Sequence, residues 1–178
     1  GIAPRDLLVG VIQTYKVGGF YIYPPLQHWI LSVVTLPITI ALLVKAPSFE
    51  QSALISTFVN TEWAMTAYSV VARLVSTFMG LGTLVVVWDW AKRHFGPRAG
   101  LFAAATVALN QTFAYYGQTS NLDGPALFWI VLSLRAWSEP SPARLRRAFL
   151  FGACAVATKD QAYAALIVPG LAASFAYV

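Results

Sequence analysis

The strongest constraint on this chain is a series of long stretches without a charged residue. They cover residues 24–44, 74–88, 99–122, 124–134, 148–158 and 161–178. A helix needs about 20 apolar residues to cross the hydrocarbon core of a bilayer. The two shortest stretches are flanked by arginines, whose long stems can lie in the membrane while their charged ends reach its surface. We therefore predict an all-α fold, a polytopic bundle of transmembrane helices.

The composition excludes a soluble fold. Hydrophobic residues make up 58% of the 178 positions and charged residues 11%, whereas soluble domains are about 45–50% apolar and about 25% charged. We expect a single integral membrane domain in a plasma membrane or, in a prokaryote, an inner membrane. It would hold an interfacial segment over about 1–23 and helices over about 26–46, 65–91, 98–117, 124–138, 145–158 and 161–178. The chain begins at Gly1 and ends at Val178 within an apolar run, so we interpret it as a fragment, truncated at both ends.

The basic residues predict how the bundle is oriented. Two short basic segments, 92–98 and 140–147, should face the cytoplasm, because short cytoplasmic loops are enriched in Lys and Arg. Residues 116–125 and 158–161 then lie on the outer side. The net charge of +5 does not indicate a nucleic-acid partner, since the positive residues gather at helix ends and form no single basic face. Asp89 and Arg93 are four residues apart and should form a structural ion pair.

The start of the first apolar stretch allows two interpretations. Pro37 lies within the expected helix, and a proline there usually produces a kink. Residues 28–46 could cross the membrane fully, which would place the Tyr-Pro-Pro segment inside. They could also re-enter the membrane or lie on its surface, which would keep that segment outside.

Polar residues on the outer side are the candidates for chemistry, since the sequence has no phosphate-binding glycine loop, serine elbow or histidine pair at metal-ligand spacing. Asp123 is a candidate to cap the next helix and also to serve as a metal ligand, an acid or a base, and the two roles are compatible. Lys159 lies outside, against the usual bias of positive charge, and Arg73 is placed similarly. Both residues could bind a lipid phosphate or extend to the membrane surface.

An ordered set of motifs carries a resemblance to a known family. The motifs are Tyr-Pro-Pro-Leu-Gln-His-Trp (23–29), Ala-Arg-Leu-Val-Ser (72–76), Lys-Arg-His-Phe-Gly-Pro-Arg-Ala-Gly-Leu-Phe-Ala-Ala (92–104), Thr-Ser-Asn-Leu-Asp-Gly-Pro-Ala-Leu-Phe-Trp (119–129) and Ala-Thr-Lys-Asp (157–160). Together they resemble the protein-mannosyltransferase-like, dolichyl-phosphate-mannose-dependent glycosyltransferases of the GT-C superfamily, to which the aminoarabinose transferases are related. The resemblance covers residues 20–170 and rests on the order and spacing of the set.

The resemblance implies an enzyme that takes a sugar from a polyprenyl-phosphate donor on the non-cytoplasmic side and transfers it to a lipid, glycan or protein acceptor. Such proteins carry an acidic pair in the first outer loop, and its Asp is the catalytic base. That pair is absent here, because Asp6 follows Arg5 and precedes no Glu. We therefore expect the base to lie upstream of Gly1 and the fragment alone to be inactive.

The same resemblance implies roles for particular residues. The departing lipid phosphate needs positive charge, and Lys159 and Arg73 are the candidates to contact it. Asp123 would support catalysis by organising the outer site or by binding a divalent metal cation as a cofactor. The remaining candidates for substrate binding are Tyr23, Pro24, Pro25, His28 and Asn121.

Two other classes of protein compete with this interpretation. A membrane transporter would also contain intramembrane charges and kinked helices, and a non-catalytic membrane scaffold would need no site at all. The charged residues gather near one membrane face, which favours the enzyme over the transporter.

Overall fold

The computed structural model describes residues 24–48, 50–138 and 141–176, and within these ranges the chain is helical and holds no strand. The all-α prediction is thus confirmed. The expected interfacial segment 1–23, with Asp6 and Tyr23, lies outside the described residues.

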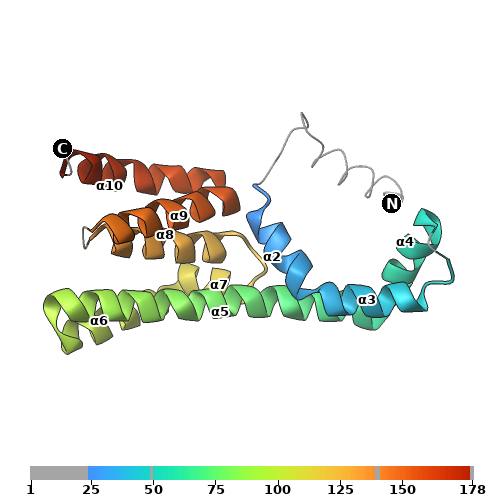
Figure 1. Ribbon diagram of the computed structural model, residues 1–178. Helices are drawn as coiled ribbons and strands as arrows, with labels where there is room; N and C mark the ends of the chain where they lie inside the picture. Colours follow the sequence, from blue (N-terminus) through green and yellow to red (C-terminus); the bar gives the residue numbers. More distant parts are fainter. Residues whose placement is uncertain (1–23, 49, 139–140, 177–178) are drawn as a thin grey trace. The chain divides into compact units, whose positions relative to one another are not determined.

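The chain divides into two compact units. The first includes residues 28–71 and contains most of α2 (Leu26–Val34), α3 (Leu36–Lys45), α4 (Gln51–Asn60) and the start of α5 (Glu62–Phe95). The second includes residues 24–27 and 72–178. It contains the rest of α5, then α6 (Pro97–Ala108), α7 (Gln111–Gln118), α8 (Asp123–Trp137), α9 (Pro142–Thr158), the short 3-10 helix η1 (Asp160–Ala162) and α10 (Tyr163–Ala176). Figure 1 labels the α-helices.

The first apolar stretch is two helices rather than one. The pair α2 and α3 is bent by 59°, and Pro37 stands in the first turn of α3. A proline has no N–H to donate to the carbonyl four residues earlier. The N–H groups of Thr35 and Thr39 on either side keep their bonds, to the carbonyls of Leu31 (2.8 Å) and Thr35 (3.0 Å). The kink predicted from Pro37 is therefore present, and the bent pair fits either a broken span or a re-entrant loop.

Side chains of α3, α4 and α5 hold the first unit together. The hydroxyl groups of Thr39 and Tyr68 are 2.8 Å apart, and the Tyr68 ring stacks on Phe58 with 6.3 Å between ring centres. The ammonium of Lys45 lies 5.4 Å from the centre of the Trp63 ring, a cation–π distance. Tyr68 thus ties the start of α5 to both preceding helices.

Helix length limits how many membrane spans the structure shows. By length and apolar composition α5 can cross a membrane, and the bent pair of α2 and α3 would be a second span if it counts as one; no other described helix passes the same test. Helix α5 has 34 residues and is about 51 Å long at 1.5 Å per residue. Helices α8, α9 and α10 have 15, 17 and 14 residues. The structure therefore has one long helix, one bent pair and several shorter helices.

The stretch 98–117, expected as one helix, is divided between α6 and α7. Asn110 has an extended backbone, and its side-chain oxygen accepts a hydrogen bond from the N–H of Phe113 (3.0 Å), as an N-cap residue does. Gly96 makes the preceding turn between α5 and α6 with φ of +89°, a conformation that favours glycine. These two positions decide where the chain changes direction before the site.

Helices α8, α9 and α10 pack side by side, with each running opposite to its neighbour along the chain (Figure 1). The buried hydroxyl of Ser133 on α8 donates a hydrogen bond to the carbonyl of Ala148 on α9 (2.8 Å). A small core of Ala155, Ala162 and Leu166 lies further along, covered by Trp129 and Ile130. This antiparallel packing brings the start of α8 to the end of α9.

The approach of α6 to α5 depends on Gly100. A Cβ atom at this position would lie 2.7 Å from the carbonyl oxygen of Trp88 and 3.1 Å from the backbone nitrogen of Lys92. We expect Gly100→Ala to lower the thermal midpoint of the detergent-purified protein, because overpacking costs about 1–3 kcal/mol. Gly117→Ala is the matched control, since no atom beyond its chain neighbours and its own helix backbone lies within 4 Å of its Cβ position in the described structure. A midpoint that is unchanged in Gly100→Ala would contradict the close contact.

Candidate functional site

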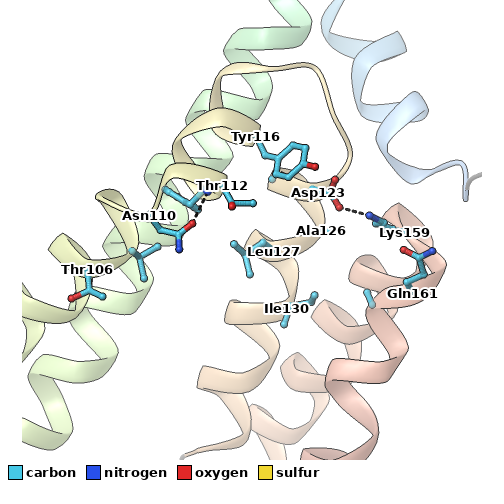
Figure 2. Close-up of a pocket in the computed structure, with 14 residues that line it drawn as sticks. Thr106, Asn110, Thr112, Tyr116, Asp123, Ala126, Leu127, Ile130, Lys159 and Gln161 are labelled. Atoms are coloured by element: carbon cyan, nitrogen blue, oxygen red, sulfur yellow. Dashed lines mark hydrogen bonds and ion pairs between the residues drawn. The ribbon is translucent and has the colours of Figure 1, made fainter.

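A pocket of about 550 Å³ lies in the second unit. Its walls come from the end of α6, from α7, from the first half of α8 and from the turn between α9 and α10. Figure 2 shows its lining side chains. The break at Asn110 is essential to this arrangement, because it allows α7 to form a wall apart from α6.

The pocket has an apolar wall and a polar end. Residues Asp123, Ala126, Leu127 and Ile130 all line it, and their spacing of three and four residues puts them on one face of α8. In Figure 2 Asp123 lies beside Lys159, while Leu127 and Ile130 lie further along α8. The other polar lining residues are Thr106, Asn110, Thr112, Tyr116 and Gln161. A ligand with a charged head and an apolar tail would match this lining.

Asp123 and Lys159 form an ion pair at the polar end of the pocket. They are 36 residues apart in sequence, and the antiparallel packing of α8 and α9 brings them together. Their side chains are 29% and 25% exposed, respectively. Charges this far removed from water interact more strongly than charges on an open surface.

Lys159 is held in place by its backbone. Its N–H donates to the carbonyl of Ala155 (2.9 Å), and its own carbonyl accepts from the N–H of Ala162 (3.0 Å). The neighbouring Asp160 accepts a hydrogen bond from the N–H of Gln161 (2.8 Å). The acid next to Lys159 in sequence thus bonds to the backbone of η1, and Asp123 is the acid that pairs with Lys159.

Asp123 is the first residue of α8, and Leu122 occupies the N-cap position without a side-chain capping bond. The side-chain oxygen of Asn121 accepts the N–H of Asp123 (3.3 Å). In the structure the carboxylate of Asp123 pairs with Lys159, and Leu122 rather than Asp123 occupies the N-cap position. A negative charge in the first turn is also favoured by the helix dipole.

Four of the predicted site residues are not part of this pocket's lining. Arg73 is an exposed residue of α5, and Pro24 and Pro25 precede α2, on which His28 is exposed. None of these four is among the described residues that line the pocket. Tyr23 is outside the described residues. The structure therefore brings together Asp123, Lys159 and Asn121 from the predicted set.

Sequence reasoning missed the lining residues Tyr116 and Gln161. Tyr116 lies in the outer segment 116–125, and Gln161 follows the Ala-Thr-Lys-Asp motif directly. The signal that could have found the apolar wall is the helical spacing of positions 123, 126, 127 and 130. Nothing local could have indicated which helix that face meets.

A divalent cation at Asp123 stays a prediction. Among the described residues no group of three His, Cys, Asp or Glu side chains could hold a metal ion. Asp123 is also the one carboxylate among the described residues that line the pocket. Lys159 already pairs with this carboxylate, whereas such cations usually take several oxygen ligands, carboxylates among them.

A comparison with known protein families identifies the chain. The sequence profile described as dolichyl-phosphate-mannose-protein mannosyltransferase matches residues 53–177. The chain belongs to this family. No curated protein and no solved structure matches it.

Membership in the mannosyltransferase family confirms the resemblance drawn from the sequence motifs. It implies a membrane glycosyltransferase that uses a dolichyl-phosphate-linked sugar donor, and the family name suggests that the sugar is mannose. The members of this family are integral membrane proteins, which agrees with the length and apolar composition of α5. The matched residues include the whole pocket, whereas the Tyr-Pro-Pro motif precedes them.

The ion pair can be tested by reversing its charges. Asp123→Lys should lower the thermal midpoint in detergent, because two lysines would then meet in a partly buried place, at a cost of roughly 1 kcal/mol. The double variant Asp123→Lys, Lys159→Asp should recover most of that loss. Asp160→Asn, which changes the exposed neighbouring acid, should leave the midpoint unchanged. A double variant no more stable than Asp123→Lys would mean that the two side chains do not form a pair.

Proposed function

We propose that the pocket binds the phosphate and the first isoprene units of a polyprenyl-phosphate sugar, and that the protein transfers this sugar to an acceptor on the non-cytoplasmic side of the membrane. The observation that carries the proposal is the ion pair of Asp123 and Lys159 at one end of a pocket whose wall along α8 is apolar. In this role Lys159 contacts the phosphate, and Asp123 supports catalysis by holding the lysine.

A lysine suits the leaving group of such a reaction. When the sugar departs from its lipid carrier, negative charge grows on the phosphate, and a fixed positive charge beside it stabilises the transition state. The ammonium of Lys159 has three donors, so it can bond to Asp123 and to a phosphate oxygen together. The apolar wall formed by Ala126, Leu127 and Ile130 would take the start of the isoprenoid tail.

The charges of the second unit support an orientation in which the pocket opens on the non-cytoplasmic side of the membrane. Asp123 begins α8 and Arg135 stands near its other end, which places the pocket and the basic residues about 20 Å apart along the helix axis. Arg93, Arg144 and Arg147 join Arg135 around a second pocket at that end. Since basic loops remain in the cytoplasm, the site of Asp123 and Lys159 opens on the other side.

We further propose that the shorter helices complete a multi-pass bundle in a plasma or inner membrane. Helices of 15 and 17 residues are about 22–26 Å long, so they cross most of a hydrocarbon core of about 30 Å. Arg73 remains a proposed second phosphate contact, while Asn121, His28, Tyr23, Pro24 and Pro25 remain proposed substrate contacts. The acceptor can be a lipid, a glycan or a protein.

Sugar transfer by the intact protein tests the roles of the pair. Asp123→Asn should reduce the rate of transfer from a polyprenyl-phosphate sugar at least 100-fold while membrane insertion stays normal, because the lysine loses its fixed position. Lys159→Gln should reduce the rate similarly and also weaken donor binding. Asp160→Asn is the matched control and should keep wild-type turnover. Wild-type turnover in Asp123→Asn would leave the pair a structural role, and solute uptake into proteoliposomes without transfer would favour a transporter.

The orientation can be tested with single cysteines. Cys154 is the one cysteine of the chain, so Cys154→Ser supplies a background without thiols. Ser120→Cys, in the exposed loop before α8, should react with a membrane-impermeant maleimide added outside intact cells. Ser138→Cys, at the basic end of α8, should react only after the membrane is permeabilised. The reverse pattern of labelling would place the pocket in the cytoplasm.

A further inference from the structure

A second pocket, of about 250 Å³, lies at the far end of α8 from Asp123. Its lining contains four arginines from three helices: Arg93 of α5, Arg135 of α8, and Arg144 and Arg147 of α9. Leu132, Ala136 and Phe151 complete it. The glycosyl transfer proposed above makes no use of this arginine pocket.

The positive charge around the arginine pocket exceeds the negative charge that reaches it. The carboxylate of Asp89 pairs with Arg93, at 3.0 Å between Nε and Oδ2, and with Arg135. No carboxylate is among the described residues that line the pocket. Asp89 is thus shared by two of the guanidinium groups. The four arginines that line the pocket outnumber the two acids in the adjoining segments of the sequence, Asp89 and Glu139, so the pocket keeps a positive potential.

The sequence around this end shows the same excess. The segments 89–98 and 135–147 together contain seven Lys or Arg residues and two acids, Asp89 and Glu139. Their excess equals the whole net charge of the chain, +5. The other parts of the sequence are therefore neutral in sum.

The start of α9 carries this charge against its own helix dipole. Arg144, Arg146 and Arg147 lie in the first two turns, and the first turn has no acidic residue. Cations are unfavourable near a helix N-terminus, where the macrodipole is positive. Residues that weaken a helix in this way, with no compensating contact in the helix itself, are expected at functional sites. The charge would become favourable once an anion is bound.

We propose that the arginine pocket binds the phosphate of an anionic phospholipid from the cytoplasmic leaflet. A guanidinium group binds phosphate oxygens through two parallel hydrogen bonds, and basic pockets between membrane helices on the cytoplasmic side take lipid head groups. The apolar side chains of Leu132, Ala136 and Phe151 would lie against the glycerol and the upper acyl chain, which a free phosphate lacks. The choice of leaflet rests on the orientation proposed above, whereas the phosphate contact does not.

Lipid retention by the intact protein tests this site without any sugar transfer. The protein is purified in detergent with equal amounts of phosphatidylglycerol and phosphatidylcholine of the same acyl chains, and the bound lipids are counted by native mass spectrometry. The wild-type protein should retain phosphatidylglycerol at least fivefold over phosphatidylcholine. Arg147→Gln should lose most of that preference, and Arg147→Lys should keep part of it, because the charge remains and the paired hydrogen bonds are lost.

Arg146→Gln is the matched control. Arg146 and Arg147 are neighbours on the same helix and both are exposed, but Arg146 is not among the described residues that line the pocket. The two substitutions remove the same charge from adjacent positions, and thermal midpoints near that of the wild type would show that both variants fold. Equal loss of preference in both variants would overturn the proposal, because it would mean that anionic lipids are attracted by the general positive charge of this end of the protein and not by the pocket. No loss in either would overturn it outright.

A soluble phosphate is the other source of the same chemistry. Inorganic phosphate at millimolar concentration could displace phosphatidylglycerol from the wild-type protein and stabilise the protein only when Arg147 is present. That result would overturn the proposal that the occupant is a phospholipid. Retention of phosphatidylglycerol in millimolar phosphate supports the proposal.

Discussion

The close antiparallel packing of α8 against α9 is the interaction on which both pockets depend. It is made possible by small residues, since Ser133 and Ala148 are fully buried and joined by a hydrogen bond, and Gly152 lies where a Cβ atom would be 3.4 Å from the Ser133 hydroxyl. Small residues let helix backbones approach closely in membranes. At one end this packing joins Asp123 to Lys159, and at the other it gathers Arg135 with Arg144 and Arg147.

Local features of the fold could be predicted from the sequence because they depend on neighbouring residues. The helical state follows from long apolar stretches, the bend from Pro37, and the pair of Asp89 and Arg93 from their spacing; the structure confirms all three. The break at Asn110 was missed, because an amide side chain that caps a new helix looks in sequence like a polar residue within an old one.

Contacts between distant helices could not be predicted in the same way. Lys159 was expected to bind a phosphate, yet nothing in the sequence indicated that its partner in the structure is Asp123, 36 residues earlier. Likewise, Arg135 shares Asp89 with Arg93 across 46 residues. Such pairs follow from which helix faces meet, and that choice depends on the packing of the whole unit.

If α5 crosses a membrane, as its length and apolar composition allow, its length has a consequence for the bilayer around it. A helix of about 51 Å exceeds a hydrocarbon core of about 30 Å, and a tilt of about 40°, near the upper end of the usual range, would use only about 39 Å of it. Roughly eight residues must then stand among the head groups or in water, and the last turn, with Lys92, Arg93 and His94, is suited to that place. This reserve of length lets α5 absorb hydrophobic mismatch, so that bilayers of different thickness can hold the protein by a change of tilt alone.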